Sequence, residues 1–494
     1  MTVVDLLGTG PGRAGFIERH GLWDDAEYAA AAQALRVIDE HGIELIRVVF
    51  PDPHGLPRGK TLTREAFAAA MCDGVGAPST LVLKDTSGRT AFPVFDPAGS
   101  PVAGMAGASD LVLVPLPTTF RVLPWAERTA WVLCDIHRPD GAPLPYSTRH
   151  VLRRQLDEVA ARGLELRVGL EVEFHAFRRT GDPIGDGQVG RPGEPGQPPQ
   201  VTALSTGAQL LSEASIDAVD ELVQLLRHGL VALDLPLRTI EVEFGPSQFE
   251  ITFAPQDALR AADDLVLCRS AVKQLCARHG YHATFMARPH LPDVMSSGWH
   301  LHQCLLERET GENRFAARPG DDGALSGLAR GYLGGLLAHA PAASAFTTPT
   351  VNGYKRYRPH SLAPDRILWG ADNRGAMIRA VGGPGDPATR LENRSGEPAA
   401  NPYLSVAAQL VSGLDGIDRD LDPGAPTLRP YHDGASRLPA SLMDAVTALR
   451  ADPLFTRRFG AEFVDYWITL KQAEIDRYQA AVTDWEHREY FTLY

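Results

Sequence analysis

The chain has 494 residues, 44% of them hydrophobic, which is enough for a large core and two or three globular domains. Its 48 Lys and Arg are outnumbered by 61 Asp and Glu, and the net charge of −13 argues against a nucleic-acid partner or an anionic membrane. The five cysteines are scattered, with no CxxC pair, and indicate neither a disulfide framework nor a zinc site. The N-terminus lacks the basic start of a signal peptide, and no apolar run is long enough for a membrane helix, so we expect a soluble, cytoplasmic protein.

The first part of the chain mixes short helix and strand patterns. Asp24 and Asp25 are suited to cap an Ala-rich helix, and Gly42 is suited to end it. We expect a small α+β domain over residues 1–137, followed by a turn-rich linker over 138–143. Its predicted elements are a helix over 24–41, a strand over 43–50, a helix over 64–71 and strands over 111–115 and 131–135.

Residues 138–494 are predicted to form a larger domain with both helices and strands. Ser147 is suited to cap a helix that ends before Gly163, and an apolar strand over 168–177 comes next. From Gly181 to Pro199, eleven of nineteen residues are Gly or Pro, which is typical of a surface loop near a binding site. Further helices are predicted over 215–233, 257–279, 325–338, 405–414, 441–450 and 461–482.

The strand over 168–177 carries Glu171 and Glu173, which are two residues apart and therefore point to one face of a sheet. Two carboxylates on a half-buried face repel each other and lose hydration, and a divalent cation with oxygen ligands relieves both penalties. Such pairs also occur on solvated sheet faces, so this pair alone does not define a metal site.

Two later stretches add side chains that bind metals. In TIEVEFGPSQFEITF, from Thr239, a Gly-Pro-Ser turn allows Glu243 and Glu250 to meet on a hairpin. In SSGWHLHQCL, from Ser296, His300 and His302 share one strand face. Histidines at this spacing are often packing residues, but beside a supply of carboxylates they are typical of metal ligands.

The region from Asn352 to Leu404 is rich in arginine. Its arginines are interleaved with apolar residues such as Trp369 and Met377, which argues against a solvated surface. Arginine in such density is typical of sites that grip phosphates or carboxylates through paired hydrogen bonds. The residues concerned are Arg356, Arg374, Arg379, Arg390 and Arg394, with Glu392 between the last two on one strand face.

Taken in order, these motifs resemble those of the glutamine synthetase superfamily. They are the GLEVEF strand, the E-x-x-P-x-Q-x-E hairpin, the G-x-H-x-H strand, the NGYKR loop, the DNR segment and ANPYL. The resemblance extends from the turn at Asp52 to Ile417. It implies an α+β fold, with a small β-grasp-like N-terminal domain and a catalytic domain whose curved antiparallel sheet lines the site. It also implies a homo-oligomer with active sites between subunits, a dodecamer of two stacked hexamers.

The resemblance further implies two Mg²⁺ or Mn²⁺ ions and ATP as a cosubstrate. One ion would be held by Glu173, Glu243 and Glu250, and the other by Glu171, His300 and Glu392. His302 would lie along the bound ATP, whose phosphates would be held by Arg374, Arg379 and Arg390.

The remaining roles implied by the resemblance concern glutamate and the amine. Arg356 and Arg394 match residues that bind substrate glutamate and the transferred phosphoryl group, and Gly298 is also expected to bind glutamate. Asp52 matches an acidic residue that the small domain of a neighbouring subunit contributes to the amine site. With Arg374, these two arginines and Asp52 form the expected catalytic set.

The expected chemistry accounts for these residue types. A carboxylate does not react with an amine until one of its oxygens becomes a leaving group. ATP therefore first forms γ-glutamyl phosphate, and the amine then displaces phosphate to give an amide. Two metal ions and several arginines neutralise the charge that moves during phosphoryl transfer.

The sequence departs from the family pattern in the flap over the amine site. Where the family has K-R-x-x-P-G-x-E-A-P, residues 355–364 read KRYRPHSLAP, so Leu362 replaces the flap glutamate. An apolar side chain cannot bind ammonium or accept its proton, but it can contact the body of a larger amine. This change is similar to the branch of the family that makes γ-glutamyl amides. We expect an alkyl, aromatic or hydroxyalkyl amine rather than a polyamine.

Two alternatives stay open at this point. A glutamine synthetase with an altered flap would use ammonia in place of an organic amine. A non-catalytic homologue would act as a structural or regulatory assembly, although the complete set of six metal ligands and five arginines argues against it.

Overall fold

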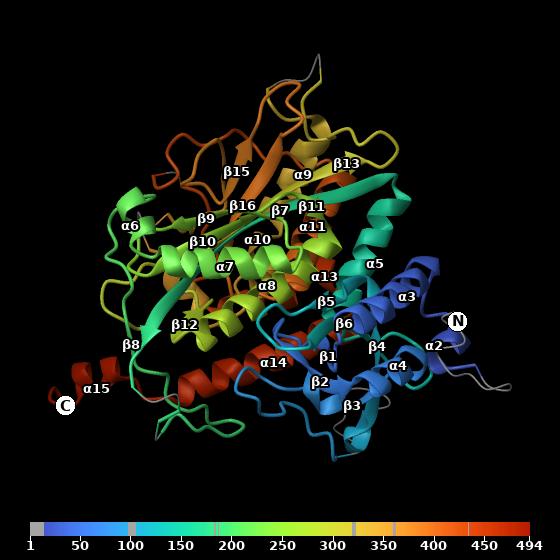
Figure 1. Cartoon of the computed structure of the whole chain (residues 1–494). Helices are drawn as coiled ribbons and strands as arrows, with labels where there is room; N and C mark the ends of the chain where they lie inside the picture. Colours follow the sequence, from blue (N-terminus) through green and yellow to red (C-terminus); the bar gives the residue numbers. More distant parts are fainter. Residues whose placement is uncertain are drawn as a thin grey trace.

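The computed structural model describes residues 14–96, 105–181, 184–185, 187–318, 323–358, 362–432 and 434–494. In this part of the chain the strands form two sheets, built from separate stretches of sequence. The first sheet lies in the blue N-terminal region of Figure 1, and the second lies in the larger part above it. The predicted α+β class is therefore confirmed.

The first sheet has six strands in the order β2-β1-β6-β4-β3, with β5 beside β6. Its pairs are antiparallel except for β1 and β6, which run parallel. Every residue of β6 is buried, as befits a central strand. The elements are α2 (Phe16–Arg19), α3 (Asp25–Glu40), β1 (Leu45–Pro51), β2 (Pro57–Thr63), α4 (Arg64–Asp73), β3 (Val75–Pro78), β4 (Asp110–Pro115), β5 (Arg121–Val122) and β6 (Thr129–His137).

Helix α3 begins and ends as its capping residues predict. The Asp24 carboxylate accepts a hydrogen bond from the Glu27 backbone N–H at 2.9 Å. Gly42 follows the helix with a φ of 60°, a left-handed conformation that glycine adopts without strain. Strand β2 was not predicted, because its polar and largely exposed residues lack an apolar alternation.

The segment expected to be a linker is folded back on β6. The Arg138 N–H donates to the Ala142 carbonyl at 2.8 Å, and the Leu144 N–H donates to the Ile136 carbonyl at 2.9 Å. The segment over 138–143 is thus a hydrogen-bonded turn. A domain boundary between residues 137 and 138 stays a prediction.

The second sheet has ten strands in the order β14-β15-β16-β13-β7-β10-β9, and β8, β11 and β12 also pair with β7. Its pairs are antiparallel except for β14 and β15. Strand β7 has 16 residues, which is long enough to pair with five others. The strands are β7 (Leu164–Arg179), β8 (Val201–Thr202), β9 (Leu237–Val242), β10 (Gln248–Phe253), β11 (Gln256–Asp257), β12 (Tyr281–Thr284), β13 (Trp299–Glu307), β14 (Trp369–Ala371), β15 (Ile378–Val381) and β16 (Arg390–Gly396).

The helices of the larger part match most of the predicted ranges. The helix expected over 215–233 is divided near Val219 into α6 and α7, and the short α10 and α13 hold too few turns for a periodic pattern to reveal them. The helices are α5 (Thr148–Ala161), α6 (Glu213–Asp217), α7 (Asp220–Ala232), α8 (Ala258–Arg278), α9 (Gly327–Ala338), α10 (Ala340–Thr347), α11 (Pro402–Asp418), α12 (Leu442–Ala451), α13 (Pro453–Phe459), α14 (Ala461–Ala480) and α15 (Asp484–Tyr490).

Two buried arginines join the first sheet to the larger part. Arg149 of α5 donates to Asp135 of β6 at 3.0 Å and to both carboxylate oxygens of Asp263 of α8. Arg269 of α8 donates to the carbonyl of Gly55, in the turn between β1 and β2, and also to carbonyls just before α11. Among the described helices, none combines the length and the apolar character that a membrane crossing requires.

Candidate active site

Strand β7 positions the centre of the site. Its apolar residues Val172 and Phe174 are buried in the core, so alternation directs Glu171 and Glu173 to the opposite face. The register of the sheet then places His300 of β13 opposite Glu171, and Glu250 of β10 opposite Glu173.

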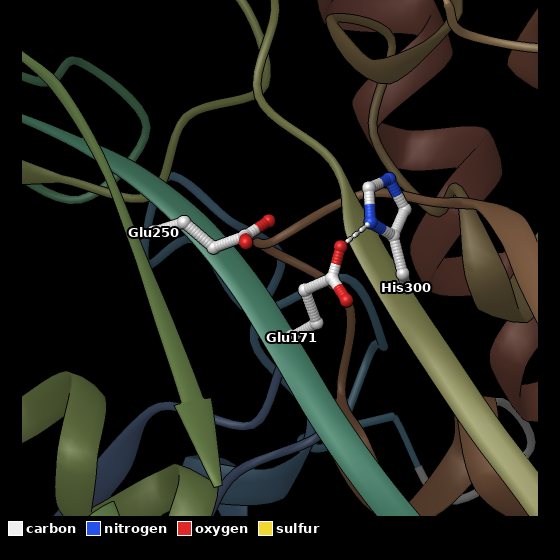
Figure 2. Close-up of side chains that lie close together, drawn as sticks. All are labelled: Glu171, Glu250 and His300. Carbon is white, nitrogen blue, oxygen red and sulfur yellow. Dashed lines mark hydrogen bonds and ion pairs between the residues drawn. The ribbon is translucent and has the colours of Figure 1, made fainter. Parts of the chain in front are cut away.

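Short distances join these side chains across the strands. His300 Nδ1 lies 2.6 Å from Glu171 Oε1, and Figure 2 shows the Glu250 carboxylate directed toward the same pair. His302 Nε2 lies 3.1 Å from the other oxygen of Glu171, and His300 Nε2 lies 3.7 Å from Glu173 Oε1. Glu243 follows β9, and its backbone N–H donates to Gln248 at the hairpin turn.

Among the residues that the structure describes, two groups of donor atoms are close enough to hold a metal ion, with all atoms of a group within 4.8 Å of one another. One group is Glu171, Glu250 and His300, and the other is Glu171, His302 and Glu392. Four of the six predicted ligands thus lie in these groups, together with His302. Glu173 and Glu243 lie outside both groups, so the division of the six residues between two ions stays a prediction.

The electrostatics of the cluster fit a bound divalent cation. Burial and the charges of Glu171 and Glu173 raise the pKa of Glu250 to about 11. Burial and the charge of Glu243 raise the pKa of Glu173 to about 8, and burial also raises that of Glu243 to about 7. Carboxylates crowded in this way need a compensating cation, and their oxygens with an imidazole nitrogen suit Mg²⁺ or Mn²⁺.

Glu171 and Glu392 differ from the other carboxylates because histidine and arginine side chains lower their pKa by more than burial raises it. Burial acts to raise the pKa of Glu171, but its contacts with His300 and His302 outweigh burial and lower it. Burial likewise acts to raise the pKa of Glu392, but the charges of Arg394, His300 and His302 together outweigh burial and lower it.

Three of the predicted arginines surround Glu392 and His302. Arg379 donates to Glu392 at 2.9 Å, and Arg394 donates to the other oxygen of the same carboxylate. Arg390 donates from Nε to His302 Nδ1 at 3.1 Å. This contact fixes the ring so that its Nε2 faces Glu171.

A cavity of about 880 Å³ opens beside the cluster. It is lined by Glu171 and by all four residues predicted to bind ATP, which are His302, Arg374, Arg379 and Arg390. Sequence reasoning missed three further arginines in its wall. Arg167, Arg238 and Arg318 lie outside every motif, and only the folded chain brings them together.

Gly298 has no side chain because the site leaves no room for one. A Cβ at this position would lie 2.9 Å from Arg356 Nη2, 3.1 Å from His300 Nε2 and 3.2 Å from Glu173 Oε1. Arg356 is buried and donates from Nη1 to the Ser395 carbonyl at 3.0 Å. The structure thus places Gly298 and Arg356 together beside the carboxylate and histidine cluster, and their role in glutamate binding stays a prediction.

Two predicted residues are not joined to this cluster by the described contacts. Leu362 is 45% exposed and has a φ of 56°, and the adjoining residues Pro359–Ser361 lie outside the described part of the chain. The Asp52 carboxylate is occupied by its own turn, since it accepts hydrogen bonds from two backbone N–H groups, those of His54 and Leu56, and from Arg58.

Comparison with known proteins agrees with this geometry. A family model described as "Glutamine synthetase, catalytic domain" matches residues 145–490. The chain belongs to the glutamine synthetase family, as the motifs predict, and the family and fold predictions are confirmed.

Individual relatives cover nearly the whole chain. The chain is 41% identical to gamma-glutamylanilide synthase from Acinetobacter sp, over 97% of this chain and 99% of the relative. It is 33% identical to glutamate–isopropylamine ligase from Pseudomonas sp, with 92% and 96% covered, and 34% identical to glutamine synthetase from Thermus thermophilus, with 94% and 99% covered. The solved structure of ligand-free GmaS matches with a TM-score of 0.77 at 29% identity, covering 92% of this chain and 99% of that one.

Proposed function

We propose that this protein is an ATP-dependent ligase that joins the γ-carboxyl group of L-glutamate to an organic amine. ATP phosphorylates the glutamate carboxylate, and the amine attacks the resulting γ-glutamyl phosphate. The products are a γ-glutamylamide, ADP and phosphate. The enzyme acts in the cytoplasm with Mg²⁺ or Mn²⁺.

The observation that carries the choice of an organic amine is Leu362. A flap that binds ammonium needs an anionic side chain to attract the cation and take its proton, and leucine supplies neither. The same side chain favours contact with a hydrocarbon or aromatic body. The greater identity to a relative named for an anilide product, 41% against 34% for a glutamine synthetase, supports the same reading.

The positions of the arginines support the roles proposed for them. Arg374, Arg379 and Arg390 line the cavity, where their guanidinium groups can bind the phosphates of ATP. Arg356, beside Gly298, can bind the carboxylate of glutamate. The carboxylates and histidines of the cluster would hold the metal ions, which supply positive charge to the phosphates. Preorganised positive charge of this kind lowers the barrier to phosphoryl transfer.

The amine must lose a proton as the amide forms. We assign this step to Asp52 of a neighbouring subunit, within a ring-shaped homo-oligomer that we expect to be a dodecamer. Arg58, at 2.9 Å, pairs with Asp52 in its own turn, so the carboxylate is oriented before any partner arrives.

The alternative is a glutamine synthetase that uses ammonia, and it is favoured by relatives of that name at 32–34% identity. A steady-state assay of phosphate release distinguishes the two. It would use Mg²⁺-ATP and glutamate with ammonia, ethylamine, isopropylamine, ethanolamine, putrescine, spermine or aniline. We expect an organic amine to give a higher kcat/KM than ammonia. Turnover with ammonia alone would overturn the proposal.

A further inference from the structure

Two buried carboxylates accept hydrogen bonds from the backbone at the start of the segment that carries Arg356 and Leu362. The backbone N–H of Thr350 donates to Glu397 Oε1 at 2.8 Å, and the Thr350 hydroxyl donates to Glu397 Oε2 at 2.8 Å. The next N–H along the chain, that of Val351, donates to Glu474 Oε1 at 3.1 Å. Two successive peptide groups are therefore fixed from two different elements.

Both carboxylates are buried, where an ionised group loses its hydration. Glu397 is fully buried, and burial raises its pKa to about 7. Glu474 of α14 is also buried, and its second oxygen accepts from Lys471 at 3.2 Å. A carboxylate buried in this way is destabilising unless hydrogen bonds compensate it. Both carboxylate oxygens of Glu397 accept hydrogen bonds from Thr350. The structural role of Glu397 is therefore to fix the position of Thr350.

The chain packs directly on Glu397 as it leaves Thr350. A Cβ on Gly353 would lie 2.7 Å from the Glu397 carboxyl group and 2.5 Å from Thr348 Cγ2, so only glycine fits. Gly353 opens the short 3-10 helix Gly353–Arg356 that carries the arginine. Glu397 itself comes directly after β16, whose Ser395 carbonyl accepts from Arg356. The C-terminal end of β16 and the residue after it thus contact both Thr350, at the start of this segment, and Arg356.

We propose that Glu397 and Glu474 are positioning residues that hold the Thr350–Val351 backbone so that the Arg356 guanidinium stays beside Gly298 in the glutamate site. This inference rests on the proposed role of Arg356 in binding glutamate. Neither carboxylate is among the grouped candidate metal ligands, and neither lines the cavity. Their loss should therefore affect glutamate and leave ATP binding unchanged.

The test compares Glu397→Ala with Glu397→Gln. Alanine leaves the Thr350 N–H and hydroxyl without acceptors, and the segment moves. Glutamine restores both contacts, because its oxygen accepts from the N–H and its amide donates to the hydroxyl oxygen. We expect the alanine variant to lose about a hundredfold in kcat/KM for glutamate, mainly through KM, with KM for ATP unchanged. The glutamine variant should recover most of this loss.

Milder variants and a control complete the experiment. Thr350→Val removes the hydroxyl, which donates to Glu397 and accepts from the Gly353 N–H at 3.0 Å. This variant should raise KM for glutamate in a folded protein even if Glu397→Ala does not fold. Glu462→Ala removes a carboxylate bonded to Tyr146 at the start of α14 and should leave both KM values unchanged. Equal changes in the KM for ATP and for glutamate, or an unchanged KM for glutamate in both Glu397→Ala and Thr350→Val, would overturn the inference.

The kinetics are measured with whichever amine the wild-type enzyme uses best. If that amine is ammonia, the proposed substrate class fails while the positioning inference is still tested. If wild-type protein releases no glutamate-dependent phosphate with any amine, the proposed function fails, and the inference that rests on it fails as well.

Discussion

Within the cluster, the ionisation of Glu173 is opposed by burial and favoured by its polar contacts. Glu173 is buried next to Glu243, yet a hydrogen bond of 2.8 Å from the Gln248 amide and the nearby charge of Arg356 favour its ionised form. Such a residue gives little stability to the metal-free protein and matters once a cation is bound. Its chemistry can therefore be tested separately from the fold.

We predict that Glu173→Ala abolishes turnover, because it removes an anionic ligand from the cluster. Affinity for Mn²⁺, measured by calorimetry, should fall about tenfold or more. Thermal stability without metal should change little, because burial and Glu243 already make the ionised form of Glu173 unfavourable. Glu65→Ala, an exposed carboxylate of α4, is the control and should behave as wild type. Near-normal activity of the Glu173 variant would contradict its assignment as a ligand.

Leu362→Glu is predicted to shift amine preference. The new carboxylate can attract ammonium and accept a proton, so kcat/KM with ammonia should rise. The kcat/KM with aniline or isopropylamine should fall about tenfold, because a charged group replaces an apolar contact. The amine panel described above measures both. If neither value changes in these directions, the flap does not select the amine.

At the scale of elements, the sequence predicted the parts of the site that are close together along the chain or joined by one turn. Glu171 and Glu173 are on one strand, and Glu243 and Glu250 flank one hairpin. The wall arginines Arg167, Arg238 and Arg318 come from distant stretches, and no local pattern reveals them. Glu397 was missed for a related reason: its importance lies in contacts with Thr350, 47 residues away.

The crossing of α9 and α11 depends on glycine at the contact. A Cβ on Gly335 would lie 1.9 Å from the Ser412 carbonyl oxygen and 2.8 Å from the Gly416 nitrogen. We predict that Gly335→Ala destabilises the protein by about 1–3 kcal/mol, seen as a lower melting temperature. Gly327→Ala, at the open start of the same helix, has free space around it and should be neutral or stabilising. Equal melting temperatures for the two variants would show that α9 can shift to accommodate a methyl group at Gly335, and would contradict the prediction.

His339, between α9 and α10, ties together three other helices. Its Nδ1 lies 2.6 Å from Asp452, at the junction of α12 and α13, and its Nε2 lies 2.9 Å from Asp415 of α11. Burial acts to lower the pKa of His339, but these two carboxylates outweigh burial and raise it. Arg419 and Arg457 also lie beside Asp415, at 2.9 and 3.5 Å, so this carboxylate is shared between His339 and two arginines.

The raised pKa gives a pH-dependent prediction with a definite sign. Because the folded-state pKa exceeds the unfolded value of about 6.5, the stabilisation is complete below that pH and is lost as the pH rises through the folded-state pKa. His339→Gln should lower stability by about 1–2 kcal/mol near pH 6 and by less near pH 9. Melting curves at both values measure the difference. A loss that grows with pH would contradict the assignment.

At the scale of the whole molecule, the proposed sharing of sites between subunits makes inactive variants complementary. We predict that Asp52→Asn and Glu173→Ala homo-oligomers are each inactive, and that co-expression restores part of the activity. A mixed interface can then combine an intact Asp52 with an intact metal cluster. The measurement is phosphate release from a co-purified hetero-oligomer carrying two different tags. An inactive mixture would place Asp52 in the same subunit as its cluster or outside catalysis.

The length of β7 also limits how this protein can change during evolution. Side chains alternate along a strand, so deleting one residue before Glu171 would turn both glutamates into the core and bring Leu170 and Val172 out to the opposite face. Deleting two residues would keep the faces but slide the cluster by about 7 Å along its neighbours. The Gly- and Pro-rich stretch that follows β7 is under no such constraint. Among relatives, insertions and deletions should therefore be frequent immediately after this strand and absent within it.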